Sequence, residues 1–155
     1  MRLYLVQHGE AVAKEVDAER PLTPEGAQTV DSVGAFLAGK GLDVPEVWHS
    51  GKTRAQQTAA RLAGRLAPNA KVLPRDGLAP KDDVGPVASV LAKRDEALMI
   101  VGHLPFLAKL AGLLLTGSSK THVLAFQYAG VFCLERDDEG EWRLAWAVVP
   151  EVLPT

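Results

Sequence analysis

LVQHGEA, from Leu5 to Ala11, is the stretch that best indicates the fold, because an apolar strand pattern ends there in a histidine and a glycine. The run Leu3–Val6 is short, continuous and apolar, which is typical of a strand buried on both faces. Ala97–Val101 (ALMIV) is a second run of this kind, and Gly102 and His103 follow it. Strands buried on both faces belong to parallel sheets that helices cover. The two stretches therefore predict an α/β fold.

Helix and strand patterns alternate along the rest of the chain. A helix is predicted to begin at Thr23-Pro24-Glu25, which offers an N-cap, a first-turn proline and a first-turn acid, and to end at Gly41. Further helices are predicted at 53–66, 84–93 and 105–115, and further strands at 44–48, 71–73, 130–135 and 142–148, the last two as a hairpin. This order predicts a mostly parallel central sheet with helices on both faces, in one domain that spans residues 1–155.

Composition narrows the class of protein. Lysine and arginine number 17 against 19 aspartate and glutamate residues, and this balance argues against general binding to nucleic acid or to an anionic membrane. No apolar run approaches the roughly 20 residues of a membrane helix, and no secretory signal is visible, so we expect a cytoplasmic protein. A single cysteine, Cys133, excludes an intramolecular disulfide and a cysteine-rich metal site.

Ligands of parallel sheets bind beyond the carboxyl ends of the strands, so the residues that follow each strand are the first candidates for a site. Two of the histidines, His8 and His103, and an arginine, Arg54, come after predicted strands with no cluster of carboxylates among them. Such side chains form a cationic pocket that suits a small tetrahedral anion, and nearby glycines let a ligand approach the backbone. The candidates are Gln7, His8, Gly9 and Glu10, then His49, Ser50 and Arg54, and finally His103.

A metal site is the rival use of the two histidines. Zinc in proteins usually has three or four ligands, and Glu10 or Asp83 could join His8 and His103. Arg54, however, would repel the cation. We therefore expect no metal and no cofactor at this site.

The motifs occur in an order that resembles a known family. His8-Gly9 lies near the start, Arg54-Ala55-Gln56-Gln57-Thr58 in the middle and Gly102-His103 later, with Pro21–Gly26 (PLTPEG) and Ser50 between. This order resembles the histidine phosphatase superfamily, and most of all its small SixA-type phosphohistidine phosphatases. The resemblance runs through most of the chain. It implies the histidine phosphatase fold and a metal-independent phosphatase activity.

The resemblance also implies roles for individual residues. His8 would be the nucleophile that forms a phosphohistidine, and a neutral imidazole is a good nucleophile near pH 7. The carbonyl of Gly9 could fix the imidazole ring through a hydrogen bond. Arg54 would clamp two phosphoryl oxygens, and His103 would donate to the same group. Ser50 matches a family serine near the phosphate site.

Gln7 departs from the family pattern, which is Arg-His-Gly. The family arginine contacts the transferring phosphoryl group. Glutamine keeps an amide donor but loses the positive charge and the bidentate fork. We therefore expect Gln7 to contribute to phosphate binding in a slow or selective phosphatase rather than in an inactive one.

The leaving group of a phosphatase also needs a proton. Asp82, Asp83 and Glu10 are candidate donors, but the sequence favours Asp82 or Asp83 as the N-cap of the helix at Val84 and Glu10 as a solvated loop residue. SixA-type proteins have no plain counterpart of this acid. Weak acid catalysis points towards phosphohistidine, because its P–N bond is labile and solvent can protonate the leaving imidazole.

The spacing between Arg54 and His103 leaves no room for a large lid subdomain, and an uncovered site suits a phosphorylated side chain on a protein surface. The expected substrate is a phosphorylated protein histidine, such as that of a histidine-transfer domain. Two alternatives remain open. One is a broad phosphomonoesterase that acts on small phosphate compounds, and the other is a catalytically weakened domain that binds phosphorylated ligands.

Overall fold

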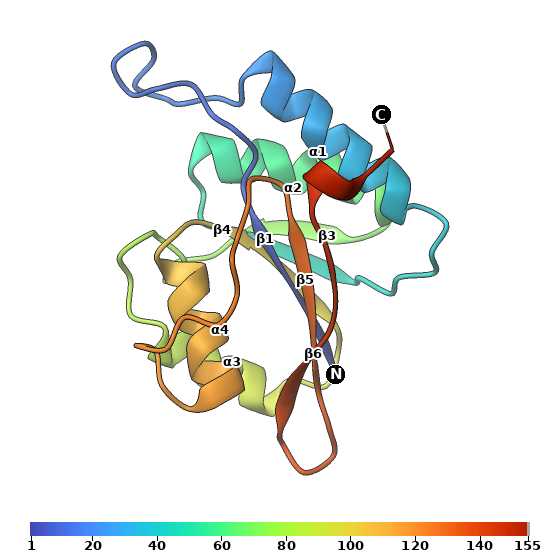
Figure 1. Cartoon of the computed structure of the whole chain (residues 1–155), viewed down its shortest axis with the longest axis vertical. Helices are drawn as coiled ribbons and strands as arrows, with labels where there is room; N and C mark the ends of the chain where they lie inside the picture. The colour runs from blue at the N-terminus through green and yellow to red at the C-terminus, as the bar shows by residue number, and fades with distance from the viewer. Residues whose placement is uncertain (155) are drawn as a thin grey trace.

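Six strands form one sheet in a computed structural model that describes residues 1–154 (Figure 1). The strand order is β3-β2-β4-β1-β5-β6. Pairing is parallel from β3 to β1 and antiparallel from β1 to β6, so the predicted mostly parallel sheet with a final hairpin is confirmed. The strands are β1 (Arg2–Gln7), β2 (Glu46–His49), β3 (Lys71–Pro74), β4 (Leu98–Gly102), β5 (Val131–Arg136) and β6 (Trp142–Val148).

The strand register brings three candidate segments to one edge of the sheet. β4 lies between β1 and β2, and all three strands are parallel. Gln7 pairs with Gly102, and His49 pairs with Val101. The residues that directly follow these positions therefore leave the sheet side by side.

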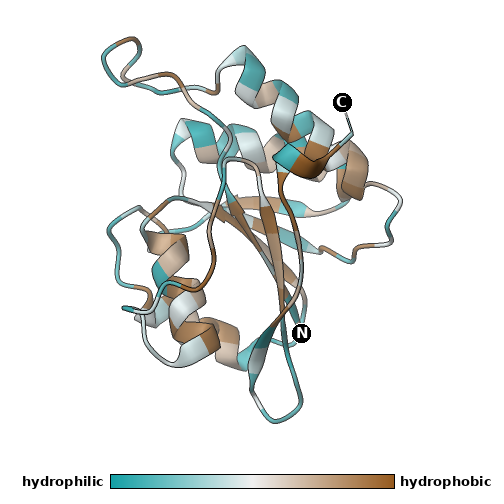
Figure 2. Cartoon of the chain, in the orientation of Figure 1, coloured by the Kyte–Doolittle hydropathy of each residue, from teal (hydrophilic) through white to brown (hydrophobic). Residues whose placement is uncertain are grey.

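Helices cover both faces of the sheet (Figure 1). The side chains of β1 alternate between two apolar layers, with Val6 packed in the layer of α1 and α2 and Leu5 in that of α3 and α4. Figure 2 shows brown, apolar stretches in the middle of the sheet and along α3 and α4, whereas the end of the β5–β6 hairpin is teal. No helix within residues 1–154 is long and apolar enough to cross a membrane. The helices are α1 (Pro24–Leu37), α2 (Thr53–Leu66), α3 (Gly85–Lys93), α4 (Phe106–Thr116) and the 3-10 turn η1 (Pro150–Val152).

Helix α1 begins as predicted but ends earlier. The hydroxyl of Thr23 accepts a hydrogen bond from the N–H of Gly26 at 2.9 Å, which is the expected N-cap. Ala38 already has an extended backbone, so the predicted end at Gly41 is wrong. Gly41 instead takes a left-handed conformation, with φ of 74°, in the loop before β2.

Between Arg54 and His103 the chain contains the rest of α2, then β3, α3 and β4, and no other helix or strand. The chain has no room there for a large lid, as the sequence predicted. The first turn of α2 and the end of β4 therefore stay uncovered by an inserted subdomain.

Candidate active site

His8 lies directly after β1 with its imidazole almost fully buried. Its Nδ1 is 2.7 Å from the carbonyl of Gly9, which can only accept, so Nδ1 carries the proton. The Nε–H of Arg54 donates to Nε2 of His8 at 3.3 Å. Two fixed partners therefore set the tautomer and leave the lone pair of Nε2 directed at a guanidinium.

Burial lowers the pKa of His8 to about 4, against the opposing effect of the Gly9 hydrogen bond, and the charges of Arg54 and Arg20 lower it further. The imidazole is therefore neutral at pH 7. A neutral imidazole with a fixed tautomer and an unprotonated Nε2 has the protonation state that a nitrogen nucleophile needs.

Gly9 packs tightly against α1, and both of its backbone groups have protein partners. Its N–H donates to Oγ1 of Thr58 at 3.0 Å, and its carbonyl is occupied by His8. A side chain at this position would place Cβ 2.8 Å from Val30 of α1 and 3.2 Å from the carbonyl of Gly26. Because Gly9 has no side chain, α1 can pack closely against it. The N–H and the carbonyl of Gly9 both bind groups of the protein.

Arg54 belongs to the first turn of α2, which points its side chain at His8. Burial lowers the pKa of the guanidinium, as does the charge of Arg20, but an arginine remains a cation at neutral pH. Within residues 1–154, Nε is the guanidinium nitrogen that makes a hydrogen bond. The two terminal nitrogens are therefore free to receive a pair of anionic oxygens.

His103 lies beside His8 and is hydrogen-bonded to Ser50. The ring centroids of His8 and His103 are 5.1 Å apart, and Nε2 of His103 shares a 2.6 Å hydrogen bond with Oγ of Ser50. Burial lowers the pKa of His103 to about 3, and the nearby charges of His8, Arg54, Lys52 and Arg20 add to this effect. His103 is neutral at pH 7, and several cationic groups surround it. The structure thus brings His8, Arg54, His103 and Ser50 together.

Gln7 is buried beside the histidines, and its backbone carbonyl accepts a hydrogen bond from Ala129 at 2.9 Å. Its side-chain Oε1 is buried and has no hydrogen-bond partner within residues 1–154. No hydrogen bond in that part of the chain joins its amide to His8, Arg54 or His103. Oε1 of Gln7 is therefore a buried polar atom without a protein partner among the described residues.

The three candidate proton donors all have local structural partners. Oε1 of Glu10 accepts from the hydroxyl of Thr23 at 2.9 Å, Oδ2 of Asp82 from the N–H of Ala79 at 2.9 Å, and Oδ1 of Asp83 from the N–H of Gly85 at 3.0 Å. Val84 is the N-cap residue of α3 and no side chain within residues 1–154 caps this helix, so the N-cap expected at Asp82 or Asp83 is wrong, and Asp83 instead forms a local turn with the N–H two residues on.

None of these carboxylates makes a hydrogen bond to the two histidines or to Arg54 within residues 1–154. Asp82 and Asp83 line a different cavity, which they share with Lys109 and His122. The same part of the chain holds no group of three or more His, Cys, Asp or Glu side chains placed to bind a metal.

Arg20 is a site residue that the sequence did not reveal. The loop 11–22 folds back on itself through a hydrogen bond from Val12 N to the carbonyl of Pro21 at 2.8 Å, and Nε of Arg20 donates to the carbonyl of Val12. The carboxylate of Glu19 accepts a hydrogen bond from the hydroxyl of Thr53, at the start of α2. The charge of Arg20 lowers the pKa of both histidines and of Arg54. In the sequence, the one indication of this role for Arg20 is its position directly before the PLTPEG stretch.

Tyr128 is a second residue that sequence reasoning missed. Its ring lies 5.7 Å from that of His8, and its backbone pairs with Gln7 beyond the end of β1. The side chain is also close enough to Arg54 to affect the pKa of that guanidinium, which it raises. Nothing local in the loop before β5 indicates this position, because the pairing joins residues far apart in the sequence.

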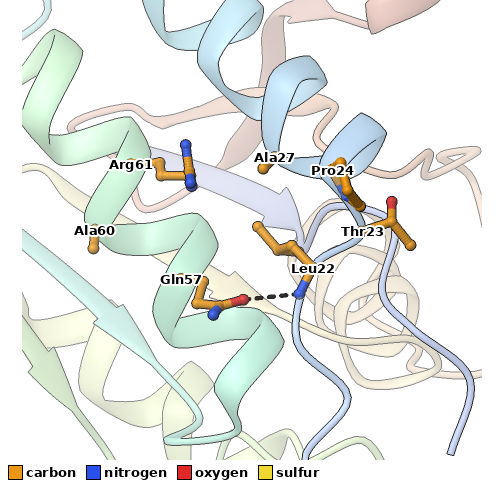
Figure 3. Close-up of a pocket in the computed structure, with 7 residues that line it drawn as sticks. All are labelled: Leu22, Thr23, Pro24, Ala27, Gln57, Ala60 and Arg61. Carbon is orange, nitrogen blue, oxygen red and sulfur yellow. Dashed lines mark hydrogen bonds between the residues drawn. The ribbon is translucent and has the colours of Figure 1, made fainter. Parts of the chain in front are cut away.

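A groove of about 500 Å³ lies between α1 and α2, next to the site (Figure 3). Oε1 of Gln57 accepts a hydrogen bond from the N–H of Leu22 at 2.8 Å across one end of this groove. The glutamine of the Arg-Ala-x-Gln-Thr motif therefore holds the segment before α1 on α2. The groove is lined by Leu22, Thr23, Pro24, Ala27, Gln57, Ala60 and Arg61.

Comparison with known proteins places the chain in a family. The model of the histidine phosphatase superfamily (branch 1) matches residues 3–79. An uncharacterised protein of Picosynechococcus sp. is 34% identical to this chain and covers 86% of it, with 84% of its own length aligned. The chain belongs to the histidine phosphatase superfamily. A further relative is the phosphohistidine phosphatase SixA of Escherichia coli, 27% identical over 97% of this chain and 94% of its own.

Solved structures share the fold of this histidine phosphatase. The protein histidine phosphatase SixA complexed with tungstate superimposes with a TM-score of 0.84 at 24% identity and covers 97% of both chains. The α-ribazole phosphatase of Shigella flexneri has a TM-score of 0.79 at 16% identity, again over 97% of both chains. Together with the family match and the E. coli relative, the sequence resemblance to a SixA-type phosphatase is confirmed, and the chain is a phosphatase of the hydrolase class.

Proposed function

We propose that this histidine phosphatase hydrolyses phosphohistidine on a protein, without a metal, through a covalent phosphohistidine on His8. The observation that carries the proposal is the neutral imidazole of His8 with Nε2 directed at the guanidinium of Arg54, 3.3 Å from Nε. An anionic phosphoryl group drawn to that guanidinium would meet the lone pair of Nε2. His103, Ser50 and Gln7 would offer it further hydrogen-bond donors.

The reaction proceeds in two displacements. The lone pair of His8 Nε2 attacks phosphorus as the P–N bond of the substrate breaks, and the electron pair of that bond goes to the leaving imidazole. Water then attacks the phosphoryl group on His8, the P–Nε2 bond breaks, and its electron pair returns to Nε2. The proton that water loses balances the one taken up by the substrate ring, so the products are histidine and inorganic phosphate. Arg54 and Arg20 counter the charge of the phosphoryl oxygens in both steps.

The surroundings of the carboxylates favour a P–N substrate over a phosphate ester. An ester leaves as an alkoxide and needs a proton from a positioned acid. Glu10, Asp82 and Asp83 each hold a local structural hydrogen bond instead. The second ring nitrogen of phosphohistidine can take its proton from solvent before the P–N bond breaks, and the imidazole then leaves uncharged.

A comparison of substrates tests the proposal. The protein is mixed with a phosphohistidine-carrying histidine-transfer domain or with phosphoserine, an alkyl phosphate ester, and phosphate release is measured for both. We expect kcat/KM to be about tenfold or more higher for the phosphorylated domain. Equal values would indicate a broad phosphatase of small phosphate compounds. Binding of the phosphorylated domain without turnover would indicate a phospho-ligand binding domain.

We expect Gln7→Arg to raise kcat/KM on phosphohistidine by about tenfold or more, because an arginine adds a charge and a second donor at the phosphate site. Gln7→Met is the matched control, since it keeps the length of the side chain and adds neither charge nor donor. Steady-state rates of the wild type, Gln7→Arg and Gln7→Met on phosphohistidine test this prediction. If Gln7→Arg gives unchanged or lower activity, the glutamine at position 7 does not limit phosphate binding.

A further inference from the structure

The backbone around Tyr128 is fixed on both sides of the residue. Tyr128 pairs with Gln7 in a parallel bridge, and the N–H of Ala129 donates to the carbonyl of Gln7 at 2.9 Å. Ala129 is fully buried and has a left-handed backbone, with φ of 63°, which is uncommon for a residue other than glycine. The N–H of Gly130 closes the turn on the carbonyl of Gln127. Tyr128 is thus held in place by an extension of the sheet rather than by a free loop.

The side chain of Tyr128 lies between the buried imidazole of His8 and solvent. Its ring is tilted by 41° to that of His8, with centroids 5.7 Å apart. His8 and His103 are 7% and 1% exposed, whereas Tyr128 is 47% exposed. A phosphoryl group that reaches Nε2 of His8 must therefore have its leaving group on the open side, where Tyr128 presents an aromatic surface.

In-line displacement places the leaving atom opposite the attacking atom across phosphorus. Because His8 lies on the buried side, the leaving group of the first step extends towards solvent. An aromatic leaving group there can stack on a second aromatic ring or meet its edge. An aliphatic or bare amine leaving group gains nothing from such a neighbour.

We propose that Tyr128 is a specificity residue that packs its ring against the imidazole of the phosphohistidine substrate during transfer to His8. The proposal rests on the proposed function and deepens it, because it names the part of the substrate that is recognised apart from the phosphoryl group. The ring of Tyr128, and not its hydroxyl, carries this role. The expected selectivity is for P–N compounds with an aromatic leaving group.

Two small substrates with the same kind of scissile bond isolate this contact. N-Phosphoimidazole leaves as an aromatic ring, and phosphoramidate leaves as ammonia. We expect Tyr128→Leu, which keeps apolar bulk, and Tyr128→Ala to lower kcat/KM on phosphoimidazole by about three- to tenfold more than on phosphoramidate. Tyr128→Phe should keep the wild-type ratio of the two substrates. Phe126→Leu is the matched control from the same segment, because the ring of Phe126 packs on Phe132.

Each outcome either supports or overturns the proposal. An equal fall on both substrates in Tyr128→Leu and Tyr128→Ala would mean that Tyr128 only supports the shape of the site. A loss in Tyr128→Phe as large as in Tyr128→Ala would assign the effect to the hydroxyl. Both results contradict the inference, whereas the proposed function is judged separately, by wild-type turnover of the phosphohistidine-carrying domain. A wild-type protein that does not turn over this domain contradicts the proposed function, and the inference with it.

Discussion

His8→Ala is expected to lose turnover of phosphohistidine by about 10⁴-fold or more, because the variant has no nitrogen to accept the phosphoryl group. The rest of the pocket stays cationic, since Arg54, Arg20 and Lys52 are unchanged. The variant should therefore still bind inorganic phosphate. Measurement of kcat/KM and of phosphate affinity separates the loss of chemistry from the loss of binding. Full activity in this variant would overturn the assignment of His8 as nucleophile.

The covalent intermediate gives a second measurement on the same variant. Wild-type protein quenched during turnover of a radiolabelled substrate should carry label that is stable in base and lost in acid, as a phosphoramidate bond is, and His8→Ala should carry none. His122→Ala is the control, because His122 is exposed and lines the separate cavity next to Asp82 and Asp83. It should be labelled like the wild type.

Arg54→Lys is expected to lower kcat/KM by about 10² to 10³ although the positive charge is kept. The lysine ammonium cannot form a planar bidentate pair of hydrogen bonds to two phosphoryl oxygens. It also has no Nε–H placed to donate to Nε2 of His8. The loss should be in kcat as well as in KM, because both the bound anion and the nucleophile lose a fixed partner. Steady-state kinetics of the variant provide the measurement.

A matched control comes from the same helix. Arg61 forms a partly exposed ion pair at 2.9 Å with Asp31 of α1, and such a pair contributes little. Arg61→Lys should therefore leave kcat/KM near its wild-type value. If Arg54→Lys behaved like Arg61→Lys, charge alone would be sufficient at position 54, and the bidentate clamp would be wrong.

The fold was predictable because its signals are local. Two continuous apolar runs marked the central strands, and Thr53–Leu66 and Trp142–Val148 have the predicted bounds. The placement of His8, Arg54 and His103 at one edge followed from parallel strands whose carboxyl ends meet. The end of α1 was misjudged because a glycine with φ above zero fits a loop as well as a helix terminus.

The parts of the site that sequence did not reveal depend on contacts between distant segments. Gly9 lacks a side chain because Val30 and Gly26 of α1 pack against it, and no property of the LVQHGEA stretch indicates that partner. Tyr128 reaches His8 through a backbone pairing with Gln7 that spans most of the chain. Arg20 reaches the site through the fold of a loop without regular structure. Periodicity and motif spacing contain no information on such contacts.

Four hydrogen bonds form a closed cycle around the nucleophile. Arg54 Nε donates to His8 Nε2, His8 Nδ1 to the carbonyl of Gly9, Gly9 N to the hydroxyl of Thr58, and that hydroxyl to the carbonyl of Arg54. In the proposed reaction, a bond from Nε2 to phosphorus would open only the first link, and the released guanidinium would turn to the phosphoryl oxygens. The other three links keep α2 in register with the loop after β1, and release of phosphate lets the cycle close again. The enzyme would thus return to its starting geometry after each turnover without moving a helix.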